Sequence, residues 1–364
     1  MHLLNILQTV LLTTTITTLI FFPTIKVSSF DYSQLNYVGS SYYYDRGKGI
    51  DSTLTELKTI TKNSQIPLES FNPEVFNIDS NGALTTQSWV KSEYFSKFKL
   101  YASNIIPTVK GDKGYPNSGI ASWHLLVKTI KSRSAAIDKI INYLNTNNLQ
   151  GIEINFEPSS IDSPTVDGQK LVEADHQNYL QFLEDLGFYL KQNKKKLFIA
   201  VPPTMSYDNP KQLFNYTSLV DRPNLIKNLD KITIMAYDFN YGNSYFSSMP
   251  HILLDELLKR AQKDLGQYPQ KVAIGFNSYG TCKNPETKKV TPLRGEEIKQ
   301  LPGWGQFIWN NPNIMDGRDL TFWSNGSVCS YPSSYTQQLR IDKIHQYGFW
   351  QFAIWSLNGN DWVN

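Results

Sequence analysis

The chain alternates between short apolar runs and longer segments with helical spacing. Four segments place apolar residues along one helical face, and they predict helices over 137–144, 179–190, 253–265 and 337–347. Shorter stretches rich in β-branched and aromatic residues predict strands over 37–44, 76–79, 104–109, 151–156, 197–201, 231–237, 272–279 and 350–357. From residue 137 onward, the helical and strand segments take turns.

The order of these elements predicts the fold class. Several strands are almost continuously apolar, which is typical of strands buried on both faces of a parallel sheet. Eight strand-helix steps favour an α/β fold of the closed (β/α)8 barrel type over an open sheet. No Ser/Gly/Pro-rich linker divides residues 30–364, so we expect one domain there. Residues 301–331 have little helical period and predict an irregular excursion after the seventh strand.

The amino-terminal residues indicate entry into the secretory pathway. Residues 3–25 are almost uncharged, and Val27, Ser28 and Ser29 form a small-residue exit, so 1–29 is the expected signal peptide. A membrane anchor is the competing interpretation, but the threonines and Pro23 make this stretch a poor permanent helix. We therefore expect no stable membrane anchor, and a protein that is secreted or held in the lumen of the secretory or lysosomal pathway.

Two sequons and a cysteine pair agree with that compartment. Asn215 opens Asn-Tyr-Thr and Asn325 opens Asn-Gly-Ser, and both are acceptor patterns for N-glycosylation. The two cysteines, Cys282 and Cys329, would form a disulfide in an oxidising lumen and join the two ends of the excursion. Two lone cysteines with no nearby histidine do not make a metal site, so we expect neither metal nor cofactor.

Composition narrows the class of partner. The net charge of +3, from 35 basic and 32 acidic residues, is too small to indicate nucleic-acid binding. The chain holds 21 Tyr, 19 Phe and 8 Trp, and flat rings with polar rims suit the faces of sugars as well as a large core. We expect a monomer whose partner is a carbohydrate.

The fourth predicted strand carries the candidate chemistry. Glu153, Asn155 and Glu157 alternate with apolar residues, so a strand would send these three side chains to one face, spaced roughly 6.5 Å apart. Carboxylates on an interior face need partners or shifted pKa values, which is typical of chemistry rather than of stability. Glu157 falls at the carboxyl end of the strand, where barrel enzymes place their active sites.

These residues resemble family 18 glycoside hydrolases, the chitinases and their relatives. Residues 151–157, Gly-Ile-Glu-Ile-Asn-Phe-Glu, are similar to the end of the family's fourth-strand pattern, Asp-x-x-Asp-x-Asp-x-Glu. Further segments are similar to the family's second, sixth, seventh and eighth strands: 76–84, Met235-Ala-Tyr-Asp238, 274–280 and Trp355. The resemblance spans residues 35–361 and implies the same barrel.

The resemblance also implies roles for individual residues. Glu157 corresponds to the general acid, and the nucleophile is the substrate's own 2-acetamido carbonyl, which closes to an oxazolinium ion. Tyr237 is expected to hydrogen-bond the acetamido oxygen, and Asp238 to hold sugar hydroxyls or the same group. Trp355 is expected to stack beneath the ring. Met235 in the sixth-strand motif and Tyr43 in the first strand complete the expected substrate-binding set.

This sequence departs from the family pattern at two strands. The three aspartates of the fourth-strand motif are Gln150, Glu153 and Asn155 here, and residues 107–111 stand in place of the third-strand Ser-x-Gly-Gly. The family aspartate at position 155 accepts the acetamido N–H and balances the positive charge, whereas an amide can only accept. Glu153 is a candidate source of the missing charge. Asn155-Phe156-Glu157 also resembles the Asn-x-Glu pair that a related family of endo-β-N-acetylglucosaminidases, glycoside hydrolase family 85, uses for the same step.

Two classes of function follow. The first is a secreted retaining hydrolase that cleaves β-1,4 bonds beside N-acetylglucosamine, in chitin, chito-oligosaccharides or, as an endo-β-N-acetylglucosaminidase, in N-glycan cores. The second is a catalytically silent chitinase-like lectin, which the loss of the aspartate at Asn155 favours. The retained trio Glu157, Tyr237 and Asp238 favours the enzyme, because a pure binder needs no proton donor at the strand end.

Overall fold

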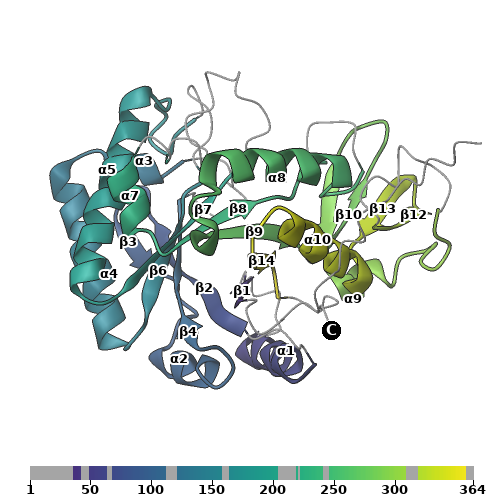
Figure 1. The fold of residues 1–364 in the computed structure, drawn as a ribbon, viewed down its shortest axis with the longest axis horizontal. Coiled ribbons are helices and arrows are strands. Elements are labelled where there is room, and N and C mark those ends of the chain that lie inside the picture. Colours follow the sequence, from purple (N-terminus) through teal and green to yellow (C-terminus); the bar gives the residue numbers. More distant parts are fainter. Residues whose placement is uncertain are drawn as a thin grey trace, which may run out of the picture. The chain divides into compact units, whose positions relative to one another are not determined.

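Eight parallel strands form a closed ring in the computed structural model of the protein (Figure 1). Each strand pairs with its neighbour in the ring, and β1 closes it by pairing with both β2 and β14. In chain order the ring consists of β1 (Asn36–Ser41), β2 (Leu68–Ile78), β5 (Thr108–Lys110), β6 (Gly151–Asn155), β7 (Lys196–Val201), β8 (Lys231–Met235), β9 (Val272–Asn277) and β14 (Gln351–Trp355). The (β/α)8 barrel expected from the sequence is confirmed.

The structure describes residues 36–41, 49–63, 68–111, 121–157, 164–203, 219, 222–240, 246–308 and 319–357. These residues belong to one unit, 32–364. The expected signal peptide (1–29), Tyr43 and the sequon asparagine Asn215 lie outside the described residues. Within the described ranges, no helix combines the length and the apolar content that crossing a bilayer requires.

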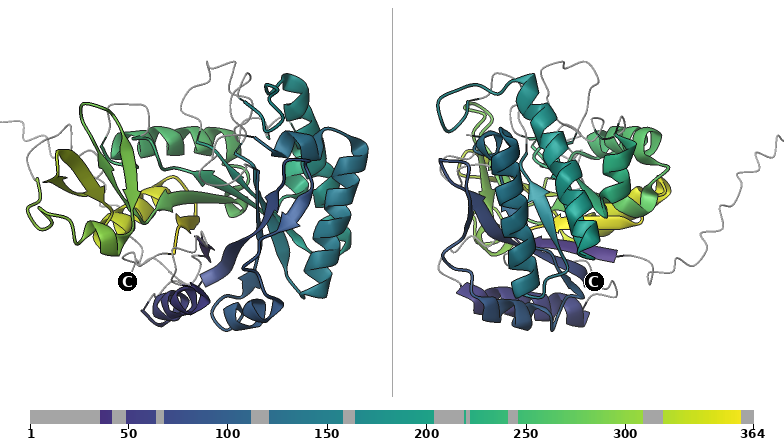
Figure 2. Two further views of the ribbon diagram at one scale, coloured as in Figure 1. Left: turned by 180° about the vertical axis from the view of Figure 1, so that it is seen from behind. Right: turned by 90° about the vertical axis from the view of Figure 1, so that its left-hand side faces the viewer.

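Helices separate the barrel strands along the chain, as Figures 1 and 2 show. The predicted helices are present and begin earlier than their apolar spacing indicated: α4 (Ile130–Thr146), α5 (Glu173–Gln192), α8 (His251–Leu265) and α10 (Ser334–Gln346). Helices that the apolar spacing did not locate are α1 (Gly49–Asn63), α2 (Ser92–Phe98), α3 (Trp123–Val127) and α7 (Pro223–Asn228). Short strands β3 (Leu84–Thr86) and β4 (Asn104–Ile105) pair with β2 outside the ring.

Packing behind β6 fixes which side chains face the barrel interior. Ile152, Ile154 and Phe156 are at most 2% exposed. The Phe156 ring stacks on Phe182 of α5, with 5.9 Å between ring centroids, and lies 5.2 Å from the ring of Tyr179. Because strand side chains alternate, this apolar row turns its polar neighbours inward.

Strand β2 is much longer than the predicted segment 76–79, because it begins at Leu68. Its buried polar residues Ser70, Asn72 and Glu74 share one parity, and Glu74 forms an ion pair with Lys110 of β5. A strand with a polar interior row and Pro73 does not show the apolar run that marks a buried strand. The sequence pattern therefore missed its first eight residues, 68–75.

The excursion after the seventh strand is present, and its described part is more regular than expected. It forms a four-stranded antiparallel sheet in the order β11-β10-β13-β12, together with the short helix α9 (Gly295–Ile298). The strands are β10 (Gly280–Lys283), β11 (Val290–Leu293), β12 (Leu320–Ser324) and β13 (Ser327–Tyr331). Phe322, Cys329, Tyr331 and Ile298 form its buried core. Thus a second small core, separate from the barrel, stabilises this insertion.

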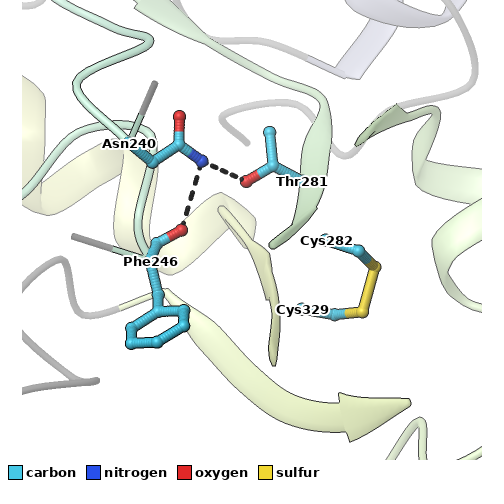
Figure 3. The surroundings of a disulfide bond; sticks show 5 residues. All are labelled: Asn240, Phe246, Thr281, Cys282 and Cys329. Atoms are coloured by element: carbon cyan, nitrogen blue, oxygen red, sulfur yellow. Dashed lines mark hydrogen bonds between the residues drawn. A yellow bond between two sulfur atoms is a disulfide. The ribbon is translucent and has the colours of Figure 1, made fainter. Parts of the chain in front are cut away.

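Two local features define the insertion sheet. Cys282 and Cys329 lie directly opposite each other on β10 and β13 and are joined by a disulfide bond (Figure 3). Ser324 pairs with Ser327, so Asn325 and Gly326, with φ of 46° and 73°, form a two-residue hairpin loop. The sequon asparagine Asn325 is therefore exposed at the tip of a hairpin.

Candidate active site

A pocket opens among the strands of the barrel and gathers residues from five of them. Strands β6, β7, β8, β9 and β14, and the residue two positions after β8, supply its lining: Glu153, Asn155, Ala200, Thr233, Met235, Tyr237, Gly275, Ala353 and Trp355. Five of the residues expected from the sequence, Glu153, Asn155, Met235, Tyr237 and Trp355, thus line one space. Aliphatic side chains and Gly275 make one part of the lining apolar, and the β6 residues make another part polar.

Glu153 is a buried carboxylate with a defined partner. Its side chain is 2% exposed, and its Oε2 accepts a hydrogen bond of 2.7 Å from Thr108 Oγ1 of β5. Burial raises the pKa of Glu153, while the hydrogen bond from Thr108, the Asn72 amide and the charge of Lys231 act in the opposite direction. The Asn72 amide favours the charged carboxylate, although its geometry falls short of a formed hydrogen bond. Burial thus favours the neutral form of Glu153, whereas its polar neighbours favour the carboxylate.

Asn155 presents an unused acceptor to the pocket. The residue is 6% exposed, and its Oδ1 has no hydrogen-bond partner among the described residues. A buried amide oxygen without a partner costs free energy unless a ligand satisfies it. Asn155 is therefore placed to accept a hydrogen bond from a bound molecule.

Glu157 stands at the carboxyl end of β6, beyond the strand itself. Its backbone adopts a φ of 46°, and its side chain is exposed. The pKa of Tyr237 is raised well above its usual value, first by burial and then by the negative charges of Glu157, Asp238 and Glu153. Glu157 therefore acts electrostatically on the same phenol that lines the pocket. The raised pKa keeps the Tyr237 hydroxyl protonated, and hence able to donate a hydrogen bond.

Asp238 is held in place by two hydroxyl groups. Its Oδ1 accepts hydrogen bonds from Tyr279 and, at 3.2 Å, from Ser248 Oγ, and its backbone N–H donates to Ser248 Oγ at 2.9 Å. Burial raises the pKa of Asp238, and the hydrogen bonds from Tyr279 and Ser248 oppose that shift. Asp238 follows β8 in a loop, and its backbone adopts a φ of 64°.

The insertion sheet supports this loop from the side. Asn240 Nδ2 donates to Thr281 Oγ1 of β10 at 2.8 Å and to the Phe246 carbonyl at 3.2 Å, next to the disulfide (Figure 3). Lys283 Nζ, also on β10, donates to the Asn240 carbonyl at 2.7 Å. The segment that carries Asp238 is therefore anchored to the insertion that the disulfide closes.

Four side chains of this site were missed by sequence reasoning: Thr108, Tyr279, Glu74 and Lys110. Tyr279 lies within the segment 274–280 that resembles the seventh strand, but nothing in the pattern connected it to Asp238. Thr108 and Lys110 belong to the third-strand segment 107–111, where they lie beside Glu153 and Asn155 in the sheet.

The part of the chain that the structure describes offers no set of side chains for a metal ion. The described residues contain no group of three or more His, Cys, Asp or Glu side chains arranged to hold one.

Comparison with known proteins identifies the family. The family model described as glycosyl hydrolases family 18 matches residues 37–360, which is most of the chain. The chain belongs to this family. Within it, the segment 107–111 keeps a hydroxyl residue, Thr108, three positions before Gly111, as the family's Ser-x-Gly-Gly does. A Cβ on Gly111 would lie 2.5 Å from the Cα of Phe156, so glycine is required for this close approach of β5 to β6.

Solved structures share the fold at low sequence identity. A chitinase from Chromobacterium violaceum is similar with a TM-score of 0.67 and 16% identity over 90% of this chain and 95% of that one. A spore cortex-lytic enzyme from Bacillus megaterium gives 0.66 and 15% identity, covering 90% of this chain and 71% of that one. Domain 2 of a group II chitinase from Ostrinia furnacalis, in a mutant complexed with a chito-oligosaccharide, gives 0.65 and 14% over 89% and 90%.

A curated relative comes from yeast. The chain is 28% identical over 333 residues to the killer toxin subunits alpha/beta of Kluyveromyces lactis. The match covers 82% of this chain and 27% of that protein. The chain thus spans about a quarter of the relative's length, and the similarity concerns one region of a longer protein.

Proposed function

We propose that the protein is a secreted glycosidase that cleaves β-1,4 bonds beside N-acetylglucosamine in chitin or chito-oligosaccharides, with Glu157 as general acid. The observation that carries this proposal is the convergence of Glu153, Asn155, Tyr237 and Trp355 on one pocket, with Glu157 at the end of the same strand as the first two. The family and the solved chitinases with the same fold support it.

The proposed first step needs one acid and no protein nucleophile. Glu157 gives its proton to the glycosidic oxygen of the leaving sugar while the acetamido carbonyl oxygen of the substrate bonds to the anomeric carbon. The glycosidic bond breaks, and its electron pair stays with the leaving oxygen. The result is an oxazolinium ion on the remaining sugar and a carboxylate on Glu157.

Three residues would stabilise this ion. The protonated Tyr237 hydroxyl donates to the acetamido oxygen, and Asn155 Oδ1 accepts the acetamido N–H. Neither supplies a negative charge, so we assign that role to Glu153, one inward position behind Asn155 on the same strand. Trp355 stacks beneath the sugar ring.

The second step returns the site to its starting state. The Glu157 carboxylate takes a proton from a water molecule as the water oxygen bonds to the anomeric carbon and the oxazolinium ring opens. Two displacements at the same carbon retain its configuration. Both steps use the proton of Glu157, which is why this residue stands at the open end of the strand rather than in the buried row.

Secretion is part of the proposal and rests on separate observations. The disulfide between Cys282 and Cys329 favours an oxidising compartment. The sequon residue Asn325 lies at an exposed hairpin tip, where a glycan could be attached without displacing packed side chains. Both features agree with a signal peptide over 1–29.

The alternative function is a chitin-binding or N-glycan-binding lectin without catalysis. Two observations favour it: the neutral Asn155 at a position where the family carries an aspartate, and the cationic Lys110 beside Asn155 in the sheet. A cation beside the site opposes the formation of a positively charged oxazolinium, although Glu74, 3.6 Å from Lys110 Nζ, offsets part of this effect.

The deciding experiment compares the wild-type protein with the variant Glu157→Gln on a chromogenic N,N′-diacetylchitobioside, and on a high-mannose glycopeptide in parallel. We expect hydrolysis of the chitobioside by the wild type and a loss of about 10²- to 10⁴-fold in kcat for the variant, with little change in oligosaccharide affinity. Glu93→Gln, at an exposed site on α2, is the matched control and should behave like the wild type. A wild type that binds but cleaves neither substrate would establish the lectin, and cleavage of the glycopeptide alone would establish the endo-acting enzyme.

A further inference from the structure

Beside the residues already assigned, the barrel interior holds an ion pair of β2 and β5 that the proposed mechanism does not use. Lys110 Nζ lies 3.6 Å from Glu74 Oε1, and the two side chains are 13% and 4% exposed. The strand register aligns Glu74 with Thr108 and Thr108 with Glu153, so these three residues form one row across three strands. Lys110 and Asn155 are paired in the next row toward the strand ends.

This arrangement places the ion pair next to the pocket. Neighbouring strands lie about 4.8 Å apart, so Lys110 and Asn155 are adjacent on the inner surface of the barrel. The negative charge of Glu74 also contributes to the raised pKa of Tyr237, which lines the pocket from β8. Glu74 and Tyr237 therefore share the same interior space, although their strands are not neighbours in the ring.

The pair is not explained by stability. Interiors of (β/α)8 barrels are usually filled by branched apolar side chains. A buried ion pair loses hydration on both ions, and well-packed apolar residues of similar volume are often as stabilising or more so. Two charges retained inside the barrel at its open end are therefore better explained by a ligand that they contact.

The chemistry of the walls indicates how a sugar would lie. One part of the pocket is formed by Ala200, Met235, Ala353 and the half-exposed Trp355, which suit the apolar face of a pyranose ring. These apolar residues lie on β7, β8 and β14, whereas the polar residues lie on β2, β5 and β6, which are neighbours in the ring. An ammonium group and a carboxylate side by side match one sugar hydroxyl, because a hydroxyl can donate one hydrogen bond and accept another.

We propose that Glu74 and Lys110 bind a free hydroxyl group of the sugar that occupies the pocket, and so select neutral sugars in which that hydroxyl is unsubstituted. This inference rests on the proposed function for the location of the sugar, and it adds the specificity of that site. Glu74 accepts from this hydroxyl and Lys110 donates to it, while Trp355 covers the face of the ring. Both residues determine specificity and take no part in the proton transfers of Glu157.

The test is a binding measurement on a folded variant that lacks both charges. Glu74→Leu combined with Lys110→Met replaces the ion pair by apolar residues, a change that leaves the stability of a fold nearly unaltered. Binding of chitotetraose is measured by calorimetry in the Glu157→Gln background, so that turnover does not interfere. We expect the dissociation constant to rise by about ten- to a hundredfold, the effect of losing a hydrogen bond to a charged group. The thermal midpoint should stay near that of the parent.

A control and a second ligand separate binding from structure. Arg133→Met removes another buried cation, whose Nε lies 3.9 Å from Asp185 Oδ2 on the outer helices, and should leave the affinity unchanged. The parent should bind chitotetraose much more tightly than its O-methylated derivative, and the double variant should lose about ten- to a hundredfold of that discrimination.

Three outcomes are distinguishable. A folded double variant with the parental affinity would make the pair structural and overturn the proposal. An acidic sugar that binds more tightly than the neutral one, with a preference that Lys110→Met removes, would assign Lys110 to an anionic substituent and overturn it as well. If the wild type cleaves nothing while the double variant still loses affinity, the proposed catalysis fails and the assignment of the pair stands.

Discussion

Removing the hydroxyl of Thr108 isolates the contribution of one hydrogen bond to the charge of Glu153. Thr108 Oγ1 donates to Glu153 Oε2 at 2.7 Å, and this bond favours the ionised carboxylate against the burial that raises its pKa. Thr108→Val keeps the shape of the side chain and deletes the donor. We therefore expect the pKa of Glu153 to rise further in the variant.

The size of the shift follows from the strength of such bonds. A hydrogen bond to a charged group contributes about 1.5–3 kcal/mol, and one pKa unit corresponds to about 1.4 kcal/mol, so the expected increase is about one to two units. In the proposed mechanism Glu153 must be ionised to balance the oxazolinium ion. Activity is then lost as the pH falls through the pKa of Glu153, and a higher pKa moves this acid limb to higher pH.

The assay is kcat/KM for the chromogenic chitobioside as a function of pH. Thr108→Ser retains the hydroxyl and should keep the acid limb close to that of the wild type. Thr233→Val is the matched control, because Thr233 lines the same pocket, is 4% exposed and has an Oγ1 without a hydrogen-bond partner in the described structure. An acid limb that stays in place or moves to lower pH in Thr108→Val would refute the role assigned to Glu153. An equal movement in Thr233→Val would attribute the effect to packing.

Three further predictions concern the same site and its support. Asn155→Asp should keep or raise activity while Glu153→Gln lowers it strongly, since the proposed ion needs one carboxylate on β6; the reverse order in kcat/KM would contradict this. Glu153→Gln should also raise the thermal midpoint at pH 7. A carboxyl whose pKa is raised by folding above its ordinary value of 4.5 contributes to stability below pH 4.5, and this contribution is lost as the pH rises through the folded pKa. Calorimetry from pH 4 to 7 should show the difference in midpoint between variant and wild type growing with pH, and a constant difference would argue against the raised pKa. Replacing Cys282 and Cys329, 47 residues apart, by serine should cost about 4 kcal/mol in the free energy of unfolding by the chain-entropy model, measured in denaturant. Free thiols titrated in the denatured, unreduced protein would contradict the bond itself.

The sequence predicted the site best where a strand shows its two faces in its own pattern. On β6 the apolar row Ile152, Ile154 and Phe156 is continuous, so the inward direction of Glu153 and Asn155 could be predicted from the alternation. On β2 the same alternation is present, but its inward row is polar and no apolar run marks the strand. Which face of β2 lies inside the barrel depends on the closure of the ring through β1, a pairing between residues far apart in the sequence.

The insertion shows the opposite case, in which a local signal was present and was not used. Asn325-Gly326 between two short alternating strands is a strong signal for a two-residue hairpin. The weak helical period of residues 301–331 predicts irregular structure instead. The contact between Tyr279 and Asp238 had no local signal, because it joins two barrel loops 41 residues apart.

Counting charges around Asn155 connects the departures of this chain with its chemistry. Relative to the family pattern, Asn155 removes one negative charge, and Lys110 adds one positive charge where the pattern has a glycine. Glu74 offsets the positive charge of Lys110, with which it is paired, but nothing in that pair replaces the negative charge lost at Asn155.

Stabilisation of the oxazolinium then depends on Glu153, whose own charge is opposed by burial. It follows that an active protein should lose activity at a pH above the ordinary range of a carboxyl group, because its balancing charge has to be ionised inside the barrel. If Glu153 stays protonated throughout the accessible pH range, the same geometry binds the acetamido sugar through Asn155 and Tyr237 but leaves the cation without an anion, which is the lectin. The acid limb of the pH profile, and its response to Thr108→Val, therefore distinguishes the enzyme from the lectin by one physical quantity, the charge of a single carboxylate.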